Sequence, residues 1–143
     1  MYTLSTNSKL HREGVDPRLI EISDLAITLS VIDFGHDKHG GLRTDEEQYE
    51  LYLKQKSKCD GYRRRGNHQA ASDGYGKALD FYAYVGGTSY EHHHLAMVAC
   101  AFLQAASILG HRIKWGGLWK SDKCKIINGV AYGWDMPHIE LID

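Results

Sequence analysis

A stripe of apolar residues near the N-terminus recurs at helical spacing, at i, i+3, i+7 and i+10. Its members are Leu19, Ile22, Ala26 and Leu29. Such a stripe predicts an amphipathic helix whose apolar face is turned toward a core. Asp16 and Pro17 precede the stripe and suit the N-cap and the first helical position, so we expect the helix to begin there.

Two more helices are indicated by their end signals. Thr44 and Glu47 have the spacing of a capping box, and the acidic residues between them favour a helix N-terminus. The longest helix is predicted over residues 89–109, which are rich in alanine and leucine. Gly110 follows as the residue after its C-cap. We therefore expect helices on both sides of the polar middle of the chain.

Short apolar segments separate these helices and predict strands. They are residues 31–34, 77–85, 113–115 and 138–142. Residues 54–75 are polar and almost without aliphatic side chains, which predicts a long surface loop. Helices and strands in mixed order predict an α+β fold, with helices packed on a small, mainly antiparallel sheet and a cleft open along one face.

The composition fits one soluble domain that spans residues 1–143. Hydrophobic residues make up 43% of the chain and charged residues 24%. The net charge of -1 lacks the basic footprint of a nucleic-acid binder. No apolar run approaches the roughly 18–20 residues of a membrane span, and no secretory signal precedes the first helix, so we expect the protein to start in a cytoplasm.

The cysteines predict free thiols. Cys59, Cys100 and Cys124 are odd in number and widely spaced, which argues against a disulfide scaffold and against a cysteine zinc cluster. Any metal site must then draw its ligands from histidine and carboxylate side chains.

Residues capable of metal and acid–base chemistry gather at the polar loop and at two strands. A catalytic zinc typically has three protein ligands and one open position, and His68, Asp80 and His138 supply such a set without cysteine. Asp135 stands three residues before His138, where a carboxylate can act as a general base. On spacing alone the loop position of His68 favours a solvated histidine, and an alternative for Asp135 is to cap a turn.

Four motifs appear in an order that carries a family resemblance. They are Gly41-Leu42-Arg43-Thr44 with Gln48, His68-Gln69, residues 74–80 (GYGKALD) and residues 134–140 (WDMPHIE). From about Pro17 to Leu141 the chain resembles the VanY-like metallopeptidases, which comprise D-Ala-D-Ala carboxypeptidases and phage L-alanyl-D-glutamate endolysins. The paired end motifs, His…Gly-x-Ala-x-Asp and Asp-x-x-His-x-Glu, are fairly specific when both occur.

The resemblance implies a role for each matching residue. It makes His68, Asp80 and His138 the zinc ligands and Asp135 the general base. It makes Arg43 the group that holds the substrate carbonyl and the developing oxyanion. The expected mechanism is metal-assisted amide hydrolysis, in which Asp135 takes a proton from the zinc-bound water and passes it to the leaving amine.

The chain departs from the family pattern at two positions. The family places its first histidine seven residues before the aspartate, but that position is Asp73 here. We interpret the difference as an insertion between His68 and Gly76; the rival interpretation is a degenerate site that binds no zinc. Gly66 stands where the family has a serine, which either loosens the loop or removes a hydrogen bond near the metal, and we expect the metal site to survive the change.

The expected function is a zinc peptidase that cuts peptidoglycan stem peptides. The branch favoured is an L-alanyl-D-glutamate endopeptidase, a monomeric phage endolysin that stays in the host cytoplasm until lysis and does not insert into membranes. One alternative is a D-alanyl-D-alanine carboxypeptidase or dipeptidase. Another is a zinc-binding or wall-binding module without catalysis.

For several other residues the sequence leaves two interpretations open. Glu140 either orients a zinc ligand or forms a salt bridge. The basic run Arg63-Arg64-Arg65, with the lysines before it, is either a solvated loop or an attractor of anionic peptidoglycan. His92, His93 and His94 point in different directions on a helix, so we interpret them as a polar helix entrance rather than one metal site. The tryptophans are expected in the core or in the walls of the cleft.

Overall fold

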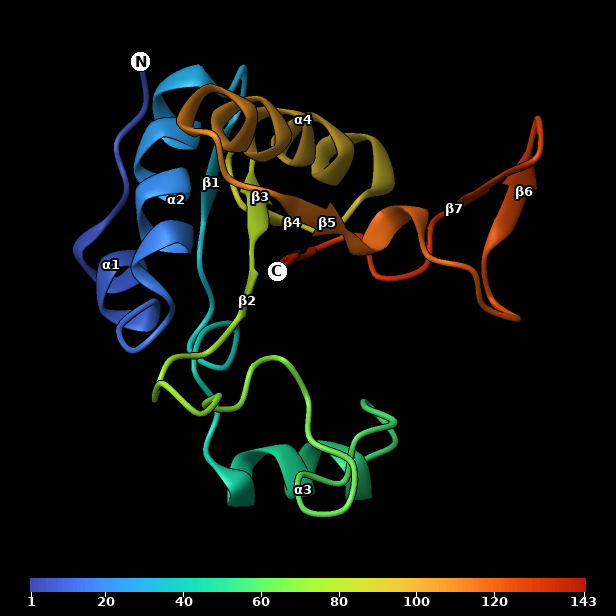
Figure 1. The fold of residues 1–143 in the computed structure, drawn as a ribbon. Coiled ribbons are helices and arrows are strands. Elements are labelled where there is room, and N and C mark those ends of the chain that lie inside the picture. The colour runs from blue at the N-terminus through green and yellow to red at the C-terminus, as the bar shows by residue number, and fades with distance from the viewer.

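The computed structural model describes residues 1–143 as an α+β fold (Figure 1). The helical elements are α1 (Thr6–His11), α2 (Pro17–Leu29), α3 (Asp45–Leu53), α4 (His92–Leu109) and the 3-10 turn η1 (Gly116–Leu118). The strands are β1 (Asp33–Gly35), β2 (Ala78–Asp80), β3 (Tyr82–Tyr84), β4 (Thr88–Ser89), β5 (Ile113–Trp115), β6 (Lys125–Ile127), β7 (Val130–Tyr132) and β8 (His138–Leu141). The predicted fold class is confirmed.

The predicted helix ends are confirmed where side chains cap the backbone. Asp16 accepts a hydrogen bond from the backbone N–H of Arg18 at 2.9 Å and caps α2. Thr44 and Glu47 form both bonds of a capping box at the start of α3. Gly110 ends α4 with a φ of 75°, a left-handed conformation that suits glycine. Local chemistry therefore sets where these helices begin and end.

Helices α2 and α4 pack together and supply most of the core. The buried stripe of α2 and the buried residues of α4, Phe102 among them, belong to one apolar cluster. The residues of α4 reach the length and composition of a membrane span, with a mean hydropathy of 1.2 over 18 residues, so the expectation that no segment approaches one is wrong on these criteria. Because its apolar face is packed on α2 inside the protein, α4 has the character of a core helix.

The strands form three small antiparallel sheets rather than one. Their orders are β1-β3-β4, β2-β8-β5 and β6-β7. The single strand predicted over residues 77–85 is wrong, because β2 and β3 belong to different sheets. Phe81 lies between them, buried, and its N–H donates to the carbonyl of Pro137 at 2.8 Å. The chain changes partners there, from β8 to β1.

Several short elements were not predicted from the sequence, among them β4 and η1. The short helix α1 lies at the N-terminus, and the hairpin β6–β7 projects away from the body of the protein (Figure 1). The hairpin turns at Asn128 and Gly129, whose φ angles of 50° and 78° fit a type I′ turn. An Asn-Gly pair between apolar residues is a strong hairpin signal, so the sequence did carry this information.

The loop that follows α3 lies on the opposite side of β2 from the helical core (Figure 1). As predicted, residues 54–75 contain no helix or strand. The three cysteines are free thiols, again as predicted. Strand β2 thus stands between the polar loop, from which it emerges, and the α2–α4 layer (Figure 1). At its carboxyl end the side chain of Asp80 meets His68 of the loop.

Asp16 joins the helical layer to the segment that leads into β2. Its buried carboxylate accepts hydrogen bonds from Arg18 and, at 2.7 Å, from Lys77 just before β2. The bonds from Arg18, joined by the bond from Lys77, hold the pKa of Asp16 well below its usual range, although burial opposes them. We expect Asp16→Ala to lower the free energy of unfolding by about 2–4 kcal/mol at neutral pH, measured by urea denaturation.

The pH dependence of this loss follows from the lowered pKa. The stabilisation is present above the unfolded-state pKa of about 3.9 and is lost as the pH falls below it, so the difference between wild type and Asp16→Ala shrinks in acid. Asp73→Asn is the matched control, since Asp73 contacts the same Lys77 from an exposed position. A loss in Asp73→Asn as large as that in Asp16→Ala would contradict the role given to Asp16.

Candidate active site

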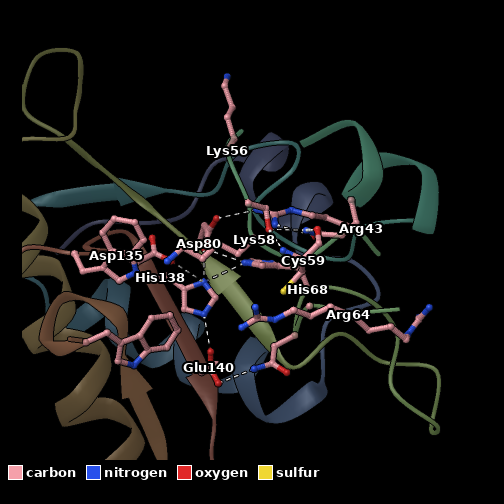
Figure 2. A pocket seen from close by; sticks show the side chains of 17 residues that line it. Arg43, Lys56, Lys58, Cys59, Arg64, His68, Asp80, Asp135, His138 and Glu140 are labelled. Carbon is pink, nitrogen blue, oxygen red and sulfur yellow. Dashed lines mark hydrogen bonds and ion pairs between the residues drawn. The ribbon is translucent and has the colours of Figure 1, made fainter. Parts of the chain in front are cut away.

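The pairing of β2 with β8 places two of the predicted ligands face to face. In the antiparallel register Asp80 lies opposite His138. The Oδ1 atom of Asp80 is 3.0 Å from Nδ1 of His138. His68 reaches the same point from the loop, with its Nε2 atom 3.1 Å from Asp80 Oδ1 and 3.2 Å from His138 Nδ1. The structure therefore brings together all three residues expected as ligands (Figure 2).

In both His68 and His138, the ring nitrogen that faces away from Asp80 donates to an oxygen that can only accept a hydrogen bond. Nδ1 of His68 donates to the carbonyl of Gly41 at 2.9 Å, and Nε2 of His138 donates to the carboxylate of Glu140 at 3.0 Å. In a neutral ring the proton then sits on this outer nitrogen. The other nitrogen, Nε2 of His68 or Nδ1 of His138, carries a lone pair and faces Asp80.

The three inward atoms fit a small metal ion. Ligand atoms around a tetrahedral zinc, at bond lengths of about 2.0–2.1 Å, stand about 3.3 Å from one another. The 3.0–3.2 Å separations between the three inward atoms of His68, Asp80 and His138 are close to that value. Two imidazole nitrogens and one carboxylate oxygen are a ligand set that leaves a fourth position open.

The buried cluster favours positive charge at its centre. Burial alone would lower the pKa of His138, but hydrogen bonds to Asp80 and Glu140 raise it to about 10. Burial would likewise raise the pKa of Asp80, yet His68 and His138 hold it well below its usual range. An ionised carboxylate in such a place needs a cation beside it, which either a proton on the histidines or a bound metal ion supplies.

The backbone of Asp80 is fixed by a histidine that the sequence did not single out. His36 is fully buried, and its Nδ1 donates to the carbonyl of Asp80 at 2.7 Å. Its Nε2 lies 2.8 Å from the hydroxyl of Ser23 on α2. Burial lowers the pKa of His36 to about 4, so the ring is neutral and Nε2 accepts from the hydroxyl. This chain of bonds ties the candidate ligand Asp80 to the helical core.

Arg43 lies against the outer oxygen of Asp80. Its Nη2 is 3.3 Å from Asp80 Oδ2, its Nε donates to the carbonyl of His39 at 2.8 Å, and its Nη1 is 3.3 Å from Oε1 of Gln48. The backbone N–H of Arg43 donates to the carbonyl of His68 at 2.9 Å. Arg43 is therefore held beside the cluster by both its side chain and its backbone.

Asp135 stands on the other side of the histidines from Arg43 (Figure 2). Its Oδ2 is 3.8 Å from Nδ1 of His138, too far for a hydrogen bond and near enough to reach a group bound between them. A side chain on Gly116 would collide with the Asp135 backbone at 2.5 Å, so a glycine is needed there for this close approach. Burial in the cleft walls raises the pKa of Asp135, an effect that neighbouring His138 opposes.

These groups line one open cleft of about 480 Å³. Trp119 and Trp134 form part of its wall, and the ring of Trp119 lies 5.0 Å from that of His138 between ring centres. Five basic side chains line it as well, and they are Arg43, Lys56, Lys58, Arg64 and Arg65. A cleft with a polar cluster at its base and aromatic side chains in its wall can hold an extended peptide.

The structure leaves Asp73 outside the cleft. Its exposed carboxylate contacts Lys77 and accepts the N–H of Tyr75 at the tip of a small loop, while His68 takes the place beside Asp80. Of the consecutive histidines, His93 and His94 gather with Glu91 on the surface of α4, with possible ligand atoms within 4.8 Å of one another. His92 instead packs its ring against Tyr132.

The comparisons with known proteins agree with one another on the kind of enzyme. The sequence model of the phage L-alanyl-D-glutamate peptidase family matches residues 1–142. The chain belongs to this family. It is thus a peptidoglycan peptidase, as the sequence predicted. No curated protein matches the chain.

The solved structure of a relative supports the same assignment for this peptidase. It is the crystal structure of the Serratia marcescens L-Ala D-Glu endopeptidase ChiX, which superposes with a TM-score of 0.73 and 27% sequence identity. The match covers 98% of this chain and 90% of the other. The fold and the family of the peptidase are therefore shown by independent comparisons of sequence and structure.

Some residues that shape the peptidase site were missed by sequence reasoning. Gln48 had been noted only as part of a motif, yet its buried amide links Arg43 to the polar loop. Asn67 donates to Glu140 at 2.6 Å, and His36 holds Asp80. A buried polar residue gives no local pattern in a sequence. Only the adjacency of Asn67 to His68 hinted at its place.

Glu140 offers a direct test of how the site is built. Its buried carboxylate accepts from His138 on one oxygen and from Asn67 on the other, and the bond from His138 helps to keep its pKa low against burial. We expect Glu140→Ala to weaken binding of Zn²⁺ or Co²⁺ about 10–100-fold, since His138 loses the partner that orients it. Titration calorimetry and the Co²⁺ absorption spectrum measure this directly.

Glu140→Gln is the matched variant. A glutamine carbonyl still accepts the ring proton of His138, so this variant is expected to retain most of the metal affinity. Equal affinities in wild type and Glu140→Ala would show that the carboxylate plays no part in orienting His138.

Proposed function

We propose that this peptidase is a zinc-dependent L-alanyl-D-glutamate endopeptidase that acts on peptidoglycan stem peptides as a phage endolysin. The observation that carries the proposal is the meeting of His68, Asp80 and His138 at 3.0–3.2 Å in the cleft, with Asp135 and Arg43 on opposite sides. Family membership and the ChiX match support the choice of scissile bond.

Zinc is the metal that the donor set favours. Two imidazoles and one carboxylate in near-tetrahedral separation, without a thiolate, are typical of catalytic zinc sites. When bound, such an ion lowers the pKa of a coordinated water and polarises the substrate carbonyl. The residues that hold it in this proposal are His68, Asp80 and His138.

Asp135 is proposed as the general base. Burial raises the pKa of Asp135, which makes it a stronger base than an ordinary aspartate. From its place near His138 Nδ1 the carboxylate takes the proton of the attacking water and gives it to the amine that leaves. The backbone N–H of Asp135 donates to the carbonyl of Gly116 at 3.1 Å, which helps to hold it in place.

Arg43 is proposed to stabilise the negative charge that develops on the substrate carbonyl. A guanidinium has five N–H donors, and the contacts to His39, Gln48 and Asp80 use three of them. The remaining donors are free to meet an oxyanion. Because Gln48 and the backbone hold the guanidinium in place, little reorganisation is needed when the charge appears.

The scissile bond is tested by digestion of purified Gram-negative sacculi and mass spectrometry of the products. We expect peptides that begin at D-Glu, released only with metal, lost with a chelator and restored by zinc. Free D-Ala among the products would instead indicate a carboxypeptidase. Metal binding at one equivalent without any product would indicate a binding module and overturn the proposal.

The base assignment is tested by Asp135→Ala. Loss of the base is expected to lower kcat about 10²–10⁴-fold while one equivalent of zinc stays bound, because Asp135 is not among the ligands. His138→Ala is the contrasting variant and is expected to lose the metal itself. Near wild-type turnover in Asp135→Ala would rule out this residue as the base.

A further inference from the structure

Three of the basic side chains that line the cleft have no carboxylate partner. Arg43 is engaged by Asp80, and Arg65 by Asp45 at 3.0 Å. Lys56, Lys58 and Arg64 form no ion pair. They are exposed to solvent at the rim of the cavity that holds the His–Asp cluster. These three residues form a cationic rim around the cavity.

The loop that carries the cationic rim is fastened to the site rather than hanging free. The amide nitrogen of Gln48 donates to the hydroxyl of Ser57 at 2.8 Å and to the carbonyl of Cys59 at 3.0 Å. The oxygen of the same amide is the partner of Arg43. One buried glutamine therefore sets the distance between the rim and the candidate oxyanion-binding arginine.

A second set of bonds orders the turn before Arg64. The carboxylate of Asp60 accepts the backbone N–H groups of Tyr62 and Arg64, and Gln69 donates to the carbonyl of Gly61 at 2.9 Å. Lys58 lies in the same loop, and its Nζ is 5.8 Å from the ring centre of Trp134. The turn that bears Arg64 is thus ordered, while the side chain of Lys56 extends outward at the mouth of the cleft (Figure 2).

The acidic groups of the cleft do not neutralise the rim. Asp80 is shared by the histidines and Arg43, and Glu140 by His138 and Asn67. Figure 2 shows Arg43 and Arg64 on one side of the histidines and Asp135 on the other. Positive charge therefore faces the space beside the cluster, where an anionic group on a bound peptide would lie.

We infer that Lys56, Lys58 and Arg64 form a carboxylate-binding subsite that selects stem peptides with a free carboxylate on the amine side of the scissile amide. The inference rests on the proposed function. A D-Glu linked onward through its side chain leaves its α-carboxylate free beside that amide. A diamino acid such as diaminopimelate at the next position offers a second carboxylate. Both present the same chemistry to the rim.

The test uses four synthetic stem peptides and the zinc-loaded full chain. The second residue is D-Glu or its α-amide, and the third is diaminopimelate or lysine. We expect wild type to prefer a free carboxylate by about tenfold or more in kcat/KM, as for a charge-assisted hydrogen bond. Whichever change in the peptide, amidation of D-Glu or replacement of diaminopimelate by lysine, lowers kcat/KM identifies the carboxylate that the rim binds.

Lys56→Gln/Lys58→Gln/Arg64→Gln is the variant that removes the subsite. Its preference for the free carboxylate is expected to fall toward one, mainly through a rise in KM, and the salt dependence of KM is expected to flatten. The Asp60 turn survives because it is made by backbone groups of Arg64. Arg63→Gln is the matched control, since Arg63 has the same charge in the same run and does not line the cleft.

The outcomes separate this inference from the proposed function. Equal cleavage of all four peptides by wild type would overturn the subsite and leave the endopeptidase intact. An equal loss in Arg63→Gln and in the triple variant would reduce the effect to general attraction and also overturn it. If no peptide is cut, binding of the same peptides followed by fluorescence anisotropy still decides whether the rim selects a carboxylate.

Discussion

The antiparallel pairing of β2 with β8 is the constraint on which the rest of the site depends. Because side chains alternate along a strand, His138 and Glu140 face the cleft while Ile139 and Leu141 are buried in the core. One short strand therefore holds a candidate ligand, the carboxylate that orients it and part of the apolar core. The packing that stabilises the fold is also what aligns Asp80 with His138.

Charge in the cleft is organised around one partly buried carboxylate. The Oδ1 atom of Asp80 contacts His68 and His138, and its Oδ2 atom contacts Arg43. Its backbone carbonyl accepts a hydrogen bond from His36. Removing such a group from water is costly unless it is partnered, and these bonds supply its partners. Gln48 extends this order outward, since it joins Arg43 to the loop that bears the cationic rim.

Local chemistry could be predicted from the sequence, and long-range choices could not. The cap at Asp16 and the helix end at Gly110 depend on neighbouring residues only. The division of the predicted strand at Phe81 depends on β8 and β1, which no local pattern announces. The ligand set was predicted by resemblance, while the positions of His36 and Gln48 became apparent only in the folded chain. The hairpin at Asn128 was missed although its signal is local.

The small loop between His68 and Asp80 bears on how such enzymes diverge. Its base is closed by a bond from Lys77 N–H to the carbonyl of Asn67 at 2.7 Å and by a bridge between Ala70 and Gly76. Residues gained or lost beyond that base leave the two candidate ligands, His68 and Asp80, where they are. Insertion or deletion of one residue within β8 would instead turn the side chains that follow to the opposite face of the strand. Insertions and deletions should therefore accumulate in the loop during evolution and be purged from the strand, so strand register identifies distant relatives better than fixed motif spacing.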